Sequence, residues 1–63
     1  MEEPVYNKEY HIFREGKYLG IATWKQDSNV GDHFNKQYVD EREGVINLVH
    51  IADRWVPVNQ QLN

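Results

Sequence analysis

Apolar and polar residues alternate along two neighbouring segments near the start of the chain. Glu9–Arg14 and Lys17–Trp24 are rich in aromatic and β-branched residues and flank a short break at Gly16. Alternation with a period of two is typical of strands covered on one face, and glycine adopts the positive φ that a tight hairpin turn requires. The two segments therefore predict an antiparallel hairpin, with Tyr10 and Ile12 on one face of its first strand.

The second of these segments contains a glycine between two large aromatic residues. Strict alternation places Tyr18, Gly20, Ala22 and Trp24 on one face of the strand. A glycine inside a strand marks a bulge, a bend or the close approach of another group. We expect an aromatic ring to cover Gly20.

The middle of the chain leaves two interpretations open. Lys25–Asp32 is rich in turn-forming residues and predicts a loop. His33–Val39 fits an extended segment, which the small number of apolar anchors favours. It also fits a short helix near residues 33–43, with Asp32 as N-cap and Gly44 as the residue after its end.

The apolar run Val45–Ala52 is the strongest strand signal in the sequence. Both of its faces are mostly apolar, which predicts a central strand covered on two sides by a closed barrel or by a second subunit. Trp55–Val58 predicts a last strand, which Pro57 confines to an edge position or a strand end. Val5 and Tyr6 are expected to pair at an edge of the sheet.

These elements predict an all-β fold, a small antiparallel sheet or SH3-like barrel of four or five short strands. The alternative is an α+β fold of the ββαββ type, with the helix near 33–43. The turn and strand-entry spacing resembles small SH3-like barrels over about half of the chain, in Val30-Gly31-Asp32-x-Phe34, Gly44-Val45-Ile46 and Trp55-Val56-x-Val58. We expect one domain over residues 1–63, with residues 1–4 and 59–63 disordered.

Length and cysteine content restrict how such a domain is stabilised. A chain of 63 residues buries only about 60% of the surface that its extended form exposes. The sequence contains no cysteine, so disulfides and thiolate metal sites are excluded. Packing of the two tryptophans, four tyrosines and two phenylalanines, or self-association, must supply the stability instead. A homodimer is therefore one expected state.

Charge and hydropathy narrow the partners. The formal net charge is −3 and the lysines and arginines stand singly, so no basic tract is available to neutralise phosphates. No apolar stretch approaches the roughly 20 residues of a membrane span, and no signal sequence is visible. We expect a cytoplasmic protein that binds a protein partner or itself, and neither nucleic acid nor a membrane.

The sequence offers little material for catalysis or metal binding. The sequence contains one serine, Ser28, and one threonine, Thr23. The three histidines lie on separate segments, at His11, His33 and His50. Zinc requires three or four converging ligands, and the loop from Asp27 lacks the ligand spacing of an EF-hand. We expect a protein that is not an enzyme and has no cofactor and no metal.

The remaining function is contact through the surface of the sheet. We predict a non-enzymatic interaction module that binds a protein through a sheet edge or an aromatic patch, with Tyr18, Trp24 and Trp55 as contributors. The alternative is a weak binder of single-stranded nucleic acid that stacks bases on Tyr10, Tyr18 and Trp24. A third alternative is a small-ligand or pH sensor centred on His50, the histidine in the apolar strand.

Overall fold

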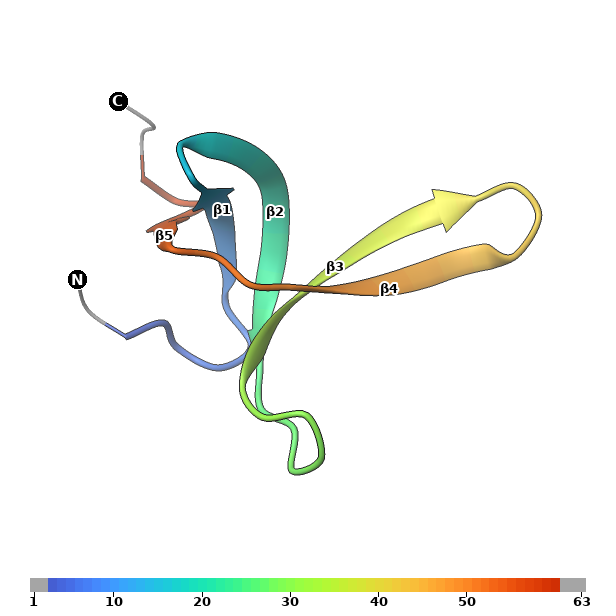
Figure 1. Ribbon diagram of the computed structural model, residues 1–63, viewed down its shortest axis with the longest axis horizontal. Helices are drawn as coiled ribbons and strands as arrows, with labels where there is room; N and C mark the ends of the chain where they lie inside the picture. Colours follow the sequence, from blue (N-terminus) through green and yellow to red (C-terminus); the bar gives the residue numbers. More distant parts are fainter. Residues whose placement is uncertain (1–2, 61–63) are drawn as a thin grey trace.

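The computed structural model describes residues 3–60, and within them the fold is all-β. Five antiparallel strands form one sheet: β1 (Glu9–Arg14), β2 (Lys17–Lys25), β3 (His33–Asp40), β4 (Gly44–His50) and β5 (Arg54–Pro57). Their order in the sheet is β4-β3-β2-β1-β5 (Figure 1). The predicted all-β class is confirmed, and β4 and β5 form the two edges of an open sheet.

The helical alternative at residues 33–43 is wrong, because this segment forms β3 and the following turn. β3 pairs with β4 from Phe34 opposite His50 to Asp40 opposite Gly44. The Asp40 carboxylate closes the hairpin by accepting hydrogen bonds from the main-chain N–H groups of Arg42 (2.8 Å) and Glu43 (3.1 Å). Gly44 follows with φ of 82°, so the residue read as a helix terminator starts β4.

The hairpin turn predicted at Gly16 is confirmed. Glu15 and Gly16 have φ of 52° and 80° and connect the paired residues Arg14 and Lys17. Two consecutive positive φ angles match the two-residue turn whose twist suits a β-hairpin. The predicted and observed bounds of β1 agree, and β2 extends one residue beyond its prediction, to Lys25.

The core is small and is centred on Phe34. Ile12 is fully buried, and Tyr10, Ala22 and Phe34 are almost so. The Phe34 ring centroid lies 4.6 Å from that of Trp24, and further ring contacts join Phe34 to Tyr10 and Trp55. The predicted face of β1, with Tyr10 and Ile12 together, is therefore the buried one.

A bulge at Leu19 changes which side chains of β2 share a face. Ile12 pairs with Gly20 whereas Phe13 pairs with Tyr18, so Leu19 is the extra residue. The bulge that Gly20 suggested is present. It turns Tyr18 to the face opposite Ala22, so the predicted common face of Tyr18 and Trp24 is wrong.

Gly20 is covered by a lysine and not by the expected aromatic ring. A Cβ atom added to Gly20 would lie 2.5 Å from the Lys36 Nζ atom. The Lys36 ammonium donates a hydrogen bond to the main-chain carbonyl oxygen of Leu19. The close approach that the glycine predicted therefore exists, with a different group making it.

Within the described part of a single chain, the strand after Gly44 lies at an edge of the sheet and not at its centre, so no closed barrel covers it. β4 is an edge strand, because within residues 3–60 it pairs with β3 alone. β2 pairs with β3 only from Thr23 to Lys25, so most of the β3–β4 hairpin extends beyond β2. Figure 1 shows the outer part of this hairpin projecting away from β1, β2 and β5, with no other described strand beside its free end.

The ends of the described chain differ in part from the expectations. Val5 is not in a strand, and Tyr6 lies in the turn that leads into β1. β5 is an edge strand, as Pro57 indicated. Of the segments expected to be disordered, residues 1–2 and 61–63 lie outside the described residues, and the N–H of Gln60 donates to the Pro57 carbonyl. Residues 3–60 contain no helix that is long and apolar enough to cross a membrane.

Candidate interaction surface

The projecting β3–β4 hairpin carries apolar side chains on both of its faces. The cross-strand pairs Tyr38–Ile46 and Val39–Val45 lie near its turn, and Leu48 follows along β4. Val39 is 76% exposed and Val45 61%, and Tyr38 and Leu48 are also exposed. We call these five residues the hairpin patch. Apolar side chains clustered in this way are typical of contact sites.

The outer edge of β4 is open and uncharged. Alternate residues of an edge strand direct their N–H and C=O groups away from the sheet, where a further strand can pair with them. None of the seven residues from Gly44 to His50 is Lys, Arg, Asp or Glu, and none is proline. β5 at the opposite edge contains both Arg54 and Pro57, residues that discourage pairing.

The accessible surface is large for the size of the chain. It measures 5097 Å², whereas a compact protein of 7.5 kDa exposes about 4,200 Å². The projecting hairpin is the part of the fold that departs most visibly from a compact shape (Figure 1).

The structure brings two of the three predicted contact aromatics together. Trp24 and Trp55 both pack against Phe34, and both line a shallow hollow of about 270 Å³ with Tyr6 and Asp32. Tyr6 stacks on Trp24 with an interplanar angle of 5°. Both indoles are only partly exposed, so their main contribution is to the core.

Tyr18 lies on the opposite face, in a second aromatic group. Its hydroxyl is 2.9 Å from the Nδ1 atom of His11, and its ring lies 5.3 Å from that of Phe13. The Arg54 guanidinium covers the Phe13 ring at 4.5 Å. Because Tyr10 is buried and Tyr18 faces away from Trp24, these three rings do not form one stacking platform.

His50 lies at the end of β4, on the face that carries Phe34. The ring is partly buried, and within residues 3–60 its Nε2 atom is buried and has no hydrogen-bond partner. A buried polar atom without a partner destabilises a fold. The burial of this ring atom therefore costs stability at the edge of the core.

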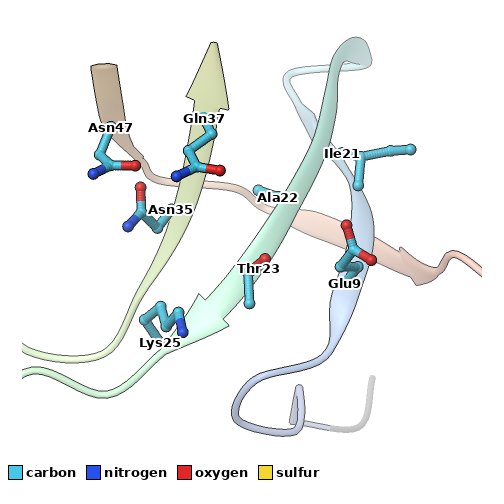
Figure 2. Close-up of a pocket in the computed structure, with 8 residues that line it drawn as sticks. All are labelled: Glu9, Ile21, Ala22, Thr23, Lys25, Asn35, Gln37 and Asn47. Carbon is cyan, nitrogen blue, oxygen red and sulfur yellow. The ribbon is translucent and has the colours of Figure 1, made fainter. Parts of the chain in front are cut away.

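A polar cleft of about 480 Å³ separates β2 from β3 on the outer face of the sheet. Figure 2 shows the carboxamides of Asn35, Gln37 and Asn47 along one side, with Thr23 and Lys25 on β2 beside them. The cleft exists because β2 and β3 diverge after their three paired residues. It offers the donors and acceptors of three carboxamides together with the charged side chains of Glu9 and Lys25.

Among the described residues, two ionisable side chains have shifted pKa values, and both make hydrogen bonds in turns or loops. The hydrogen bond from the Tyr6 hydroxyl to Asp32 (2.6 Å) raises the pKa of Tyr6, and partial desolvation and the Asp32 charge add to the effect. Main-chain N–H groups of Val30 and Asn29 donate to Asp27 and lower its pKa. Among the described residues no three potential ligands gather to hold a metal ion.

The hairpin patch was not among the contact residues predicted from the sequence. The signal was present in the two apolar faces of the run that begins at Val45. It was assigned to a covered central strand, because apolar residues on both faces usually indicate burial. The sequence pattern does not indicate that β2 and β3 pair over only three residues.

Comparisons with protein-family models, with curated proteins and with solved structures gave no match to this chain.

Proposed function

We propose that this protein is a non-enzymatic interaction module that binds another polypeptide by strand addition to β4. The occupant is an extended, uncharged, apolar strand, which pairs with the open edge while its side chains contact the hairpin patch. Strand addition draws affinity from main-chain hydrogen bonds and specificity from the alternating side chains. A cytoplasmic location remains part of this proposal, because a chain without cysteine suits a reducing compartment.

The observation that carries the proposal is the unprotected edge of β4. Natural edge strands are usually kept from pairing by charges, prolines, bulges or short length. β4 has seven residues and none of these devices. Its one ionisable side chain is that of His50, at the end of the strand. The lack of these protecting features along the whole of β4 is explained if another strand normally pairs with this edge.

A labelled peptide tests the proposal directly. The probe is a fluorescein-labelled peptide with the sequence of residues 44–51, Gly-Val-Ile-Asn-Leu-Val-His-Ile, titrated with the protein at low concentration. Saturable binding is expected, and the Leu48→Lys variant should weaken it because a lysine is placed in the apolar contact. The Gln37→Lys variant adds the same charge one strand inward and should bind as the wild type does.

Backbone amide shifts would locate the bound peptide. Peptide addition should perturb the amide resonances of β4 and leave those of β5 unchanged. Absence of binding, or equal loss of binding in both lysine variants, would contradict strand addition at this edge.

A further inference from the structure

We infer that the strand which covers β4 is the β4 strand of a second copy of this chain, antiparallel to the first about a twofold axis at Asn47. This inference rests on the proposed function, because it names the occupant of the same edge. It yields a continuous ten-stranded sheet across two chains. Closed twofold dimers are the commonest assemblies of identical chains, and each copy then contributes the same surface.

The sequence of β4 is complementary to itself in this register. Asn47 is the middle residue of Gly44–His50, so a twofold axis there places it opposite the partner's Asn47. Ile46 then lies opposite the partner's Leu48. Apolar residues meet apolar residues, and such cross-strand pairs stabilise a sheet.

The central asparagine pair fixes the register. A carboxamide carries both donors and acceptors, so two Asn47 side chains can satisfy each other across the axis. Both project from the same outer face, where Asn47 borders the cleft in Figure 2. A shift by one residue would place Asn47 opposite an apolar residue, and the rows that contain Ile46 and Leu48 in the two chains would then lie on opposite faces of the sheet.

The charges favour the antiparallel arrangement over the parallel one. The turn of the hairpin is acidic, with Asp40, Glu41 and Glu43 around a single arginine. Antiparallel pairing about Asn47 separates the two turns by roughly 30 Å at about 3.4 Å per residue. That distance exceeds the Debye length of ~8 Å several times over, whereas parallel pairing would bring both acidic turns together.

Pairing β4 with its copy would extend one row of apolar side chains across both chains. Tyr38, Ile46 and Leu48 lie on the face that continues from Phe34, so pairing β4 with its copy joins two such rows side by side.

Cysteine cross-linking and sedimentation test the inference, because the natural chain has no cysteine. Opposed residues in an antiparallel pair have Cα atoms about 4.5–5.5 Å apart, within the range that a disulfide spans. The Asn47→Cys variant should therefore oxidise rapidly to a covalent dimer. The Gln37→Cys variant is the matched control, because residue 37 is one strand further from the axis and its copies lie about 14 Å apart.

Sedimentation equilibrium on the wild type should show reversible dimers. The Leu48→Lys variant should raise the dimer dissociation constant about a hundredfold, because it places lysines in an apolar contact. Circular dichroism and thermal unfolding of each variant verify that the fold is retained. Rapid cross-linking at position 47 alone, together with the loss of dimers in Leu48→Lys, supports the inference.

The contrary outcomes separate the two proposals. A wild-type chain that stays monomeric while still binding the residue 44–51 peptide overturns the second copy and keeps strand addition. A monomer that binds no peptide overturns both. Dimers that survive Leu48→Lys, or equal cross-linking at positions 37 and 47, show a different interface and overturn the inference.

Discussion

The ammonium group of Lys36 donates a hydrogen bond to the main-chain carbonyl of Leu19 and lies directly over Gly20. Leu19 is the bulged residue of β2, the extra residue between the pairs Ile12–Gly20 and Phe13–Tyr18. A lysine from β3 thus reaches the bulge of β2, beyond the last residue pair that joins the two strands. The bulge and the lysine form one structural unit.

The first prediction concerns Gly20, whose φ of 111° is strained for any residue with a side chain. Gly20→Ala should lower the free energy of unfolding by about 1–3 kcal/mol. The measurement is urea denaturation. The Nζ atom ends a flexible side chain and can move away, so most of the loss should persist when Gly20→Ala is made in a Lys36→Ala background. If the loss of stability disappeared in the Lys36→Ala background, its cause would be the contact with Lys36 and not the strained backbone.

The second prediction concerns Ile12, the fully buried residue of the core. Ile12→Ala should cost about 2–5 kcal/mol, which is comparable with the whole stability of a chain this short. The variant should therefore be largely unfolded by circular dichroism. Ile12→Val gives a graded readout, with an expected cost of about 0.5–1.5 kcal/mol. Ile21→Ala, at an exposed position of β2, is the control and should change stability by less than about 0.5 kcal/mol.

The third prediction concerns the unpartnered Nε2 atom of His50. His50→Leu removes a buried polar atom without a partner and should raise the free energy of unfolding by about 1 kcal/mol. His33→Leu is the control, because the His33 ring lies 2.9 Å from the Gly31 carbonyl and its loss should give no gain. A fall in stability for His50→Leu would show that the imidazole makes a contact worth more than its burial costs.

The fourth prediction concerns Asp27 and acid. Its carboxylate accepts N–H groups of Asn29 and Val30, and its pKa in the folded chain lies below the ordinary value of 3.8. The stabilisation is therefore complete above pH 3.8 and is lost as the pH falls through the lowered folded-state pKa. Asp27→Ala should be less stable than the wild type at neutral pH, and this difference should shrink in acid.

Asp27→Asn provides the control for that measurement. Its carbonyl oxygen still accepts hydrogen bonds but does not titrate, so its stability should not follow the acid transition of the carboxylate. If the difference between wild type and Asp27→Ala stayed constant from neutral to strongly acidic pH, the two N–H contacts would not stabilise the ionised form.

Local signals predicted most of the strands and the turns. The bounds of β1 follow from alternation between Glu9 and Arg14, and the turn at Gly16 follows from the need for positive φ. These features depend on residues adjacent in the sequence. The position of β4 depends instead on where β2 leaves β3, and no short stretch of sequence encodes that divergence.

The site was harder to predict for the same reason. Trp24 and Trp55 were chosen for their size, and their size is what places them against Phe34 in the core. Tyr18 was assigned to the wrong face because one bulged residue reverses the alternation beyond it. The hairpin patch consists of residues whose exposure follows from topology alone, so its apolar pattern resembled that of a buried strand.

The two edges of the sheet differ, and the difference limits how far copies of the chain can accumulate. Within the described residues β4 presents an unguarded edge, while β5 presents Arg54 and Pro57. A filament requires each molecule to accept a neighbour on both sides. Once the β4 edge is paired with a symmetry-related β4, no further copy can add there. The apolar strand is then covered and cannot template a fibril. In the proposed dimer, Arg54 and Pro57 at the far edge would keep the assembly finite.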